Sequence, residues 1–286
     1  MNYLKKFRVA QGSDPKLTDY DPDFSGKQET KKSARKKSAE LEQRMSELQF
    51  QLYAEQKQSL LICLQAPDAA GKDGVVRHVF TGINPQGCRA ISFKEPSAEE
   101  LSHDFLWRIE KQVPRRGEIA IFNRSHYEDV LVVRVHDLVP RAQWSQRFAQ
   151  INDFERNLVA NGTRILKFFL HISKEEQLER FKDRLDDPSR QWKISEADYT
   201  ERLRWPAYET AYEDVLAKCS THEAPWFIIP SNHKWFRDLA ISEIIVQTLE
   251  DMAIKVPAPT VDIAEIRQKY HQAVTRAKAK KARGAK

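Results

Sequence analysis

An apolar run that leads into a small-residue loop ending in Gly-Lys constrains the fold of this chain most strongly. Residues 60–64 (LLICL) are apolar, residues 66–74 (APDAAGKDG) form the loop, and residues 75–80 place apolar side chains at helical spacing. A strand, such a loop and a helix are the setting of a phosphate-binding P-loop. Backbone N–H groups and the positive end of the helix dipole attract the anion, and Lys72 adds a point charge. The predicted phosphate-binding residues of the loop are Ala69, Ala70, Gly71, Lys72, Asp73 and Gly74.

The loop departs from the pattern G-x-x-x-x-G-K-[ST] at both ends. Ala66 replaces the first glycine, and Asp73 replaces the Ser or Thr whose hydroxyl normally ligates Mg²⁺. The metal then needs other oxygen ligands, and Asp68 inside the loop is the nearest candidate. Outside this setting a Gly-Lys pair is usually an ordinary turn, so the prediction depends on the flanking strand and helix.

Short apolar runs recur along the chain and alternate with helical patterns. The predicted strands are residues 60–65, 88–93, 118–123, 164–172 and 226–230, and the predicted helices are residues 33–57, 97–112, 141–160, 173–185 and 234–252. Nearly continuous apolar strands that alternate with helices indicate an α/β fold in which helices cover both faces of a five-stranded, mostly parallel sheet. Ligands of such sheets bind at the carboxyl ends of the strands.

The composition indicates a globular protein with a basic end. Of the 286 residues, 41% are hydrophobic and 31% are charged, and no apolar stretch approaches the length of a membrane span. Three cysteines and no signal-peptide pattern predict a cytoplasmic protein without disulfides or a membrane partner. We expect residues 1–57 to form an irregular arm and a helix, residues 58–256 the core with a lid at about 180–205, and residues 257–286 a C-terminal segment.

The net charge of +6 belongs to the C-terminal tail. Residues 274–286 contain six Lys and Arg and no acid, which leaves 41 basic and 41 acidic residues in the rest of the chain. The tail is either a solvated, disordered end or a segment attracted to a polyanion, such as nucleic acid or a phosphate polymer. The basic cluster at 31–37 has the same two interpretations.

The segment after the third predicted strand contains groups suited to phosphoryl transfer. Arg124 can bridge phosphate oxygens with two hydrogen bonds, and Asp129 can face the P-loop and hold a metal ion together with Asp68. Glu128 is the alternative to Asp129, because only one of these two neighbouring carboxylates needs to point inward. An ordinary surface helix start would also favour acidic residues here, because the helix dipole stabilises them.

A cation-rich helix around residues 180–193 is predicted to act as a lid. Arg180 and Arg184 are four residues apart and share one helical face, whereas Phe181, with Leu178 and Leu185, marks a buried face. Arginines on a mobile helix can supply positive charge to the transferring phosphoryl group. Interspersed acids leave a salt-bridged, exposed helix as the alternative.

Other positions give weaker signals. Phe93 after the second strand is a candidate contact for a base or sugar, although a simple loop explains it nearly as well. Arg77 and Arg134 are candidates for a polyanion path, although each would more often be an ordinary surface arginine. The eight histidines show no metal-ligand spacing.

Four separated blocks in the same order resemble the polyphosphate kinase 2 family. They are DAAGKDG (68–74), HDFLWR (103–108), FNRSHYEDV (122–130) and RLDDP with WK (184–188 and 192–193), and the match runs from about residue 33 to 252. The resemblance implies a P-loop kinase fold like that of thymidylate kinase with a helical lid. It also implies Mg²⁺- or Mn²⁺-dependent phosphoryl transfer between inorganic polyphosphate and nucleotides.

Residue roles follow from the resemblance position by position. Asp68 and Asp129 resemble the carboxylates that hold the metal, Lys72 and Arg124 resemble phosphate ligands, and Arg180 and Arg184 resemble lid residues. We further expect contacts from Lys193, Arg77 and Arg134 to phosphate, and from Phe93, Asn123, Arg124 and Glu128 to the nucleotide.

Asn123 departs from the usual residue of the family, and this difference points to a subgroup. Many members have Asp at this position, and the F-N-R-S form resembles the subgroup that phosphorylates both AMP and ADP. The expected partners are therefore inorganic polyphosphate and adenine nucleotides, with other purines left open. We expect a homo-oligomer, a dimer or a tetramer, and no specific nucleic acid.

Two rival functions remain open from the residues alone. An ATP-dependent nucleoside monophosphate kinase would use the same fold, because both donors are phosphoanhydrides. A nucleotide-dependent switch or nucleic-acid-binding protein is suggested by the P-loop and basic tail, although a switch normally needs Ser or Thr where Asp73 stands.

Overall fold

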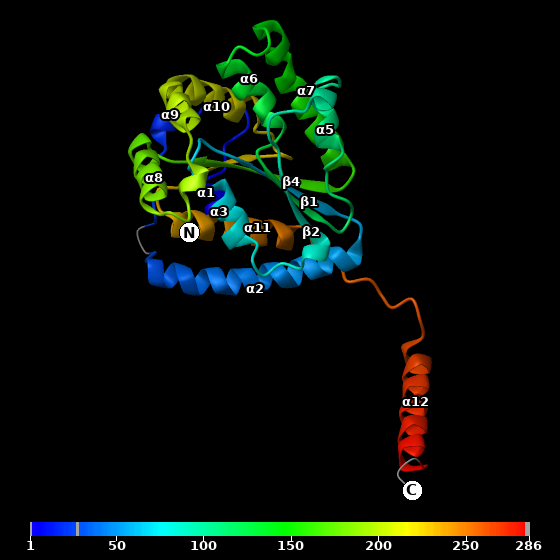
Figure 1. Cartoon of the computed structure of the whole chain (residues 1–286). Coiled ribbons are helices and arrows are strands. Elements are labelled where there is room, and N and C mark those ends of the chain that lie inside the picture. The colour runs from blue at the N-terminus through cyan, green and yellow to red at the C-terminus, as the bar shows by residue number, and fades with distance from the viewer. Residues whose placement is uncertain (1, 27–28, 284–286) are drawn as a thin grey trace. The chain divides into compact units, whose positions relative to one another are not determined.

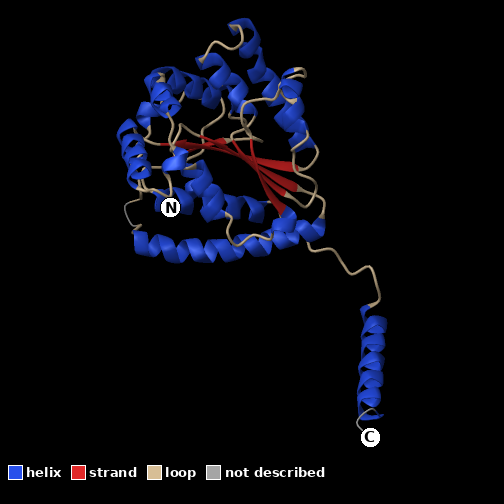
Figure 2. Ribbon diagram, viewed as in Figure 1, coloured by secondary structure: helices blue, strands red, loops and turns tan. Residues whose placement is uncertain are grey.

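Five strands form one sheet in which every neighbouring pair runs parallel. In the computed structural model, which describes residues 2–26 and 29–283, the strand order is β2-β3-β1-β4-β5 (Figures 1 and 2). The strands are β1 (Ser59–Gln65), β2 (Cys88–Ser92), β3 (Ile119–Asn123), β4 (Thr163–His171) and β5 (Trp226–Pro230). The five predicted strands and the parallel α/β fold are confirmed.

The central strand β1 shows why the sheet is buried on both faces. All seven of its residues are buried. Leu60 and Ile62 belong to the core under one face, and Leu61 and Cys63 belong to the core under the other. Successive side chains of a strand point to opposite faces, so a continuous apolar run needs a helical layer on each side.

Helices cover both faces of the sheet (Figure 1). The helices α3 (Lys72–Val79) and α11 (Lys234–Asp251) cover one face, and α2 (Lys31–Glu55) packs along α11 as a further layer. On the opposite face lie α7 (Arg141–Ala160) and α10 (Trp205–Cys219). Shorter elements in this unit are η2 (Pro85–Gly87), η3 (His126–Val130) and α6 (Val132–Val135). The predicted covering of both faces of the sheet by helices is confirmed.

The N-terminal arm is mostly irregular, as predicted, but it packs closely on the core. It contains α1 (Tyr3–Lys6) and η1 (Leu17–Asp19), and Arg8 forms an antiparallel bridge to Phe227 at the edge strand β5. Tyr3 and Leu17 are buried. The arm therefore covers an edge of the sheet that would otherwise expose unpaired backbone groups.

The predicted single helix over residues 97–112 is wrong. Ser97 and Glu100 do form the expected capping box, but α4 (Ala98–Leu101) ends after one turn and α5 (Trp107–Glu110) begins separately. Between them Asp104 accepts a hydrogen bond from the backbone N–H of Leu106. An Asp side chain that bonds the backbone two residues ahead favours a turn over a continuing helix.

The predicted buried face of the lid helix is wrong at two of its three residues. The lid segment, residues 174–203, consists of α8 (Lys174–Asp186), η4 (Gln191–Lys193) and α9 (Glu196–Leu203). Leu178 and Leu185 are 42% and 49% exposed, whereas Arg180 is buried together with Phe181. Hydrogen bonds to backbone carbonyls satisfy the arginine inside the protein, so its face points inward.

The C-terminal segment is a separate unit, Lys255–Lys286. Its helix α12 (Ile263–Arg283) replaces the disordered end that was one interpretation of the tail. Alanine, lysine, arginine and glutamine dominate its sequence, and these are strong helix formers. Residues 284–286 lie outside the described residues. Within the described parts of the chain, no helix is long and apolar enough to cross a membrane.

The packing of α2 on α11 can be tested by truncating one buried side chain. Leu52 is fully buried, so Leu52→Ala should lower the free energy of unfolding by about 2–5 kcal/mol. Phe50 on the same helix is 63% exposed, and Phe50→Ala should change it by less than about 0.5 kcal/mol. Urea unfolding followed by circular dichroism measures both. Equal effects of the two substitutions would contradict the packing of α2 in this unit.

Candidate functional site

The P-loop connects β1 to the first turn of α3. Gly71 is the N-cap residue of α3 and has φ of +105°, and Ala69 has φ of +62°. A Cβ atom at Gly71 would meet the guanidinium of Arg237, and the backbone angle favours glycine. The loop therefore closes tightly before the helix, as a phosphate cradle requires.

Two buried arginines hold the carbonyl side of this loop. Arg180 on α8 donates from Nη1 to the carbonyl oxygens of Ala69 (3.0 Å) and Ala70 (2.8 Å). Arg237 on α11 donates to the carbonyl of Ala70 at 3.2 Å. In a trans peptide the carbonyl and the next N–H point in opposite directions, so the N–H of Gly71 points away from these arginines. These hydrogen bonds from Arg180 and Arg237 orient the loop, so Arg180 is a structural contact of the loop.

Lys72 folds back over the loop in the structure. Its Nζ donates to the carbonyl oxygens of Ala66 (2.7 Å) and Pro67 (3.4 Å). Burial lowers the pKa of Lys72, and Asp68 partly opposes this effect. An ammonium group held by neutral carbonyls is available to an incoming anion, because a phosphate oxygen is a stronger acceptor.

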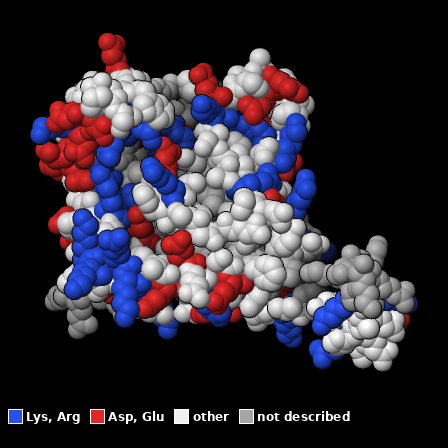
Figure 3. Space-filling view, turned by 60° about the horizontal axis from the view of Figure 1, so that its bottom comes forward, with Lys and Arg blue, Asp and Glu red and all other residues white. Residues whose placement is uncertain are grey.

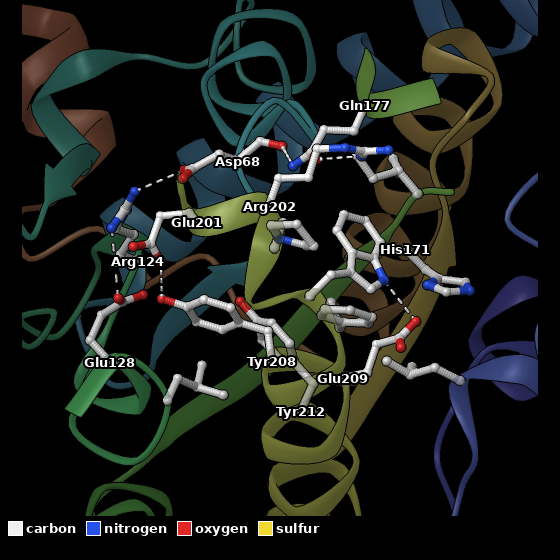
Figure 4. Close-up of a pocket in the computed structure, with 17 residues that line it drawn as sticks. Asp68, Arg124, Glu128, His171, Gln177, Glu201, Arg202, Tyr208, Glu209 and Tyr212 are labelled. Atoms are coloured by element: carbon white, nitrogen blue, oxygen red, sulfur yellow. Dashed lines mark hydrogen bonds and ion pairs between the residues drawn. The ribbon is translucent and has the colours of Figure 1, made fainter. Parts of the chain in front are cut away.

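Arg124 lies between two carboxylates. Its Nη2 is 3.1 Å from Asp68 Oδ1 and its Nη1 is 3.7 Å from Glu128 Oε2 (Figure 4). Burial opposes its charge, but Glu128 and Asp68 outweigh burial, so the pKa of Arg124 is raised. Arg124 has φ of +63°, an unusual backbone angle, and its side chain contacts Asp68 of the P-loop. The structure thus brings together three of the predicted site residues.

These three residues line a cavity of about 60 Å³ beneath the lid segment, which we call the lid cavity. Its other walls include Tyr208 and Tyr212 from α10. The charged residues that line it are Asp68, Glu128, Glu201, Glu209, Arg124 and Arg202. The four carboxylates outnumber the two arginines, so this cavity favours cations and hydroxyl groups over a polyanion.

Asp129 does not line the lid cavity, although the sequence suggested that it faces the P-loop with Asp68. Its Oδ1 accepts from Arg147 Nη1 at 3.1 Å, and Arg108 Nη2 lies 3.8 Å from Oδ2. Burial raises the pKa of Asp129 to about 6 against the opposing effect of the two arginines. The spacing alone did not reveal these two arginine partners.

Asp129 instead lines a second cavity of about 570 Å³ beside α7, which we call the α7 cavity. The α4–α5 segment forms one wall, and Gln143, Gln146 and Gln150 of α7 form another. The spacing of three and four residues places these amides on one face of the helix. Glu128 and Asp129 thus serve different cavities on the two sides of η3.

A chain of contacts joins the P-loop helix to the lid. Asn123 Nδ2 donates to Asp73 Oδ1 at 2.8 Å, and Lys193 Nζ is 3.3 Å from Asp73 Oδ2. Arg184 donates to the carbonyl of Lys193 at 3.2 Å and lies 3.6 Å from Asp198. The aspartate that replaces the usual Ser or Thr of the loop is therefore held by an amide and a lid lysine.

Phe93, Arg134 and Arg77 are among the predicted site residues that line neither cavity. Phe93 is buried against Phe122, with ring centroids 5.0 Å apart, and is a core residue. Arg134 pairs with Asp214 at 2.6 Å, and Arg77 is exposed on α3. Their assignments to nucleotide and phosphate remain predictions from the sequence.

Several site residues were missed in the sequence. They are Arg108, Arg147, Gln177, Arg202, Tyr208, Tyr212 and Arg237. Gln177, for example, donates from Nε2 to the carbonyl of Asp68 and accepts from Arg202, so it joins α8 and α9 to the P-loop. An Arg or Gln among the apolar positions of a helix was the one available signal, because a buried charged side chain needs a partner.

The donor set of the lid cavity fits a divalent cation with a small number of protein ligands. No group of three or more His, Cys, Asp or Glu that could hold a metal occurs in residues 2–26 and 29–283. Mg²⁺ usually takes one or two carboxylates, completes its shell with waters and substrate phosphates, and needs no protein cage. Asp68 and Glu128 meet that requirement, because both carboxylates line one cavity and are only partly buried.

Comparison with known proteins identifies relatives over most of the chain. The family model described as polyphosphate kinase 2 (PPK2) matches residues 28–257. A protein of Meiothermus ruber named AMP/ADP-polyphosphate phosphotransferase is 49% identical over 90% of this chain and 96% of its own. An ADP-polyphosphate phosphotransferase of Rhodopseudomonas palustris is 44% identical over 90% of this chain and 93% of its own. The crystal structure of polyphosphate kinase 2 from Arthrobacter aurescens TC1 superposes with a TM-score of 0.92 at 41% identity, covering 95% of this chain and 97% of that one.

The burial of Asp129 predicts a pH-dependent stability. Because folding raises its pKa from 3.8 to about 6, the stability it contributes is present below pH 4 and is lost as the pH rises to 6. The two pKa values limit the loss to about 3 kcal/mol. Asp129→Asn should remove this pH-dependent loss. The free energy of unfolding of the variant minus that of wild type should therefore rise between pH 4 and pH 7.

Urea unfolding at several pH values, in EDTA, measures this difference. Exposed Asp153→Asn on α7 is the control and should leave the pH profile unchanged. A constant difference between Asp129→Asn and wild type across this range would contradict the raised pKa.

Proposed function

The chain belongs to the polyphosphate kinase 2 family, and from this premise we propose that it transfers phosphoryl groups from inorganic polyphosphate to AMP and ADP, giving ADP and ATP. The names of its relatives in Meiothermus ruber and Rhodopseudomonas palustris support this acceptor range. The observation that supports the chemistry is the position of Arg124 between Asp68 and Glu128, at the end of a P-loop.

The proposed reaction depends on position and charge. A terminal phosphate at the start of α3 would accept hydrogen bonds from the loop N–H groups and from Lys72. Arg124 would bridge donor and acceptor phosphates, because its planar guanidinium offers two parallel N–H bonds. The acceptor's terminal phosphate oxygen attacks the terminal phosphorus of the polymer, and the shortened polymer leaves. No covalent enzyme intermediate is needed, since alignment and charge stabilisation account for such catalysis.

We propose that Mg²⁺ or Mn²⁺ binds at Asp68 and Glu128. Asp129, the second metal ligand implied by the resemblance, is replaced in this role by Glu128, since Asp129 is held by Arg147 and Arg108. When bound, the ion neutralises phosphate charge during transfer. The two carboxylates also form ion pairs with Arg124.

We propose that the nucleoside part of the acceptor occupies the α7 cavity. Its volume of about 570 Å³ lies in the range of small-molecule sites, whereas the 60 Å³ lid cavity holds only a few water molecules. The amides of Gln143, Gln146 and Gln150 offer both donors and acceptors, as the edge of a base requires.

We propose that polyphosphate approaches over the basic surface of the compact unit. On the face shown in Figure 3, Lys and Arg side chains gather most densely at the left, and further ones lie toward the right. The carboxylates of the lid cavity would repel the polymer, so a surface path past Lys193 to the P-loop is favoured. Arg77, exposed on α3, is a further contact for this path.

We propose a homo-oligomer of two or four chains in the cytoplasm. Large apolar side chains exposed on the surface, such as Leu138 (64%) and Leu203 (83%), support association between chains.

A product assay tests the proposed function. Purified protein with Mg²⁺ and AMP should form ADP and then ATP when polyphosphate is the donor, measured by chromatography of the nucleotides. If ADP forms when ATP is the donor but not when polyphosphate is the donor, the proposed donor is contradicted and the protein is a nucleoside monophosphate kinase.

Arg124→Ala should lower kcat by about a hundredfold or more, as loss of a transition-state charge contact does.

The assignment of the α7 cavity predicts a change in nucleotide affinity. Gln146→Leu should raise the KM for AMP by about tenfold while leaving the KM for polyphosphate unchanged, because only base contacts are lost. Asn157→Leu, on an exposed part of α7 outside the cavity, is the matched control. Equal KM values for AMP in the two variants would contradict the assignment.

A further inference from the structure

A buried polar network lies directly behind the loop that follows β3. Lys167 on β4 donates from Nζ to Glu155 Oε2 on α7 (2.5 Å), to Tyr127 Oη (2.9 Å) and to the carbonyl oxygen of Cys219 (2.7 Å). Tyr127 Oη donates in turn to Glu155 Oε1 at 2.8 Å. These side chains are no more than 1% exposed, so no solvent reaches the ion pair.

Three successive residues of the loop are fixed to this interior. Ser125 Oγ accepts from Gln65 Nε2 at 3.2 Å, His126 Nε2 lies 3.1 Å from Glu155 Oε1, and Tyr127 joins the network through its hydroxyl. Burial lowers the pKa of His126, so its imidazole is neutral and the network contains one positive and one negative group. Arg124 directly precedes this segment and Glu128 directly follows it, and both line the lid cavity.

We propose that Tyr127, Glu155 and Lys167 are positioning residues that hold Arg124 and Glu128 in the lid cavity. A buried ion pair seldom adds net stability over apolar residues of the same size, so stability alone does not explain this one. Hydrogen bonds have direction, and they fix the register of the loop in a way that apolar packing would not. The inference rests on the proposed function, because it assigns these residues a role in that reaction.

The same network also reaches α10, which forms another part of the lid cavity. The carbonyl of Cys219 that accepts from Lys167 belongs to the last residue of α10. That helix presents Tyr208 and Tyr212 to the cavity. Lys167 therefore links both walls, the loop after β3 and α10, to one point on β4.

Tyr127→Phe tests the role with little change in shape. It keeps the ring against Trp226, at a centroid distance of 4.8 Å, and leaves the ion pair of Glu155 and Lys167 in place. The loss of the hydroxyl should lower kcat by about tenfold or more at a temperature well below the thermal midpoint, because small misplacements of positioned groups are costly.

Thr163→Val is the matched control. It removes a buried hydrogen bond to Ser59 (3.0 Å) at the amino ends of β1 and β4, far along the strands from the site. Its kcat should stay within about twofold of wild type, although its thermal midpoint should fall as much as that of Tyr127→Phe. Equal kcat in both variants would overturn the proposal.

A double-mutant cycle with Arg124→Ala separates positioning from a general structural role. If Tyr127 acts through Arg124, then Tyr127→Phe should lower kcat by less than about threefold in the Arg124→Ala background. The same tenfold fall in both backgrounds would mean that the network acts on the whole fold and would overturn the proposal.

Hydrogen exchange gives a readout that does not need activity. The peptide covering residues 124–131 should exchange about tenfold faster in Tyr127→Phe, while β5 exchanges as in wild type. If the wild type transfers no phosphoryl group, the proposed function fails, and this local change would still support the positioning role. Unchanged exchange of residues 124–131 would overturn it.

Discussion

The parallel direction of all five strands is the constraint on which the site depends. Because every strand ends at the same edge, the loops after β1, β3 and β4 leave the sheet side by side. This edge brings Asp68 and Arg124, 56 residues apart in the sequence, within 3.1 Å of each other. Two layers of helices bury the strands, and α7, α8, α10 and α11 then supply the arginines, carboxylates and aromatic rings around the loops.

The loop after β3 divides the chemistry into two cavities. Its neighbouring carboxylates, Glu128 and Asp129, have different surroundings: the first contacts Arg124 in the lid cavity, and the second contacts Arg147 in the α7 cavity. This division matches a reaction with two substrates, in which metal and phosphates meet on one side and the nucleoside binds on the other. It requires a loop with one fixed register, and the buried bonds of residues 125–127 give the physical reason for that register.

Local patterns predicted the sheet and the P-loop, because apolar runs and a glycine before a helix are features of neighbouring residues. They did not predict the partner of Asp129, since Arg147 arrives from α7 and depends on how that helix packs. They also missed Arg237, which contacts the P-loop from 167 residues away in the sequence. The lid helix was placed correctly and Phe181 is buried as predicted, but Leu178 and Leu185 are exposed, because Arg180 satisfies its charge on backbone carbonyls and its side of the helix faces inward. Interactions between distant segments decided each of these points.

The account assigns Glu128 to the metal and phosphates and Asp129 to the α7 cavity. Locating Mn²⁺ in crystals grown with the ion and ATP would test this assignment most directly. The anomalous signal of Mn²⁺ identifies the ion independently of the side chains around it. The account predicts a peak in contact with Asp68 and Glu128 at the edge of the lid cavity, and none at Asp129. A Mn²⁺ peak bound to Asp129 would contradict it, because the loop after β3 would then present the other carboxylate to the phosphates.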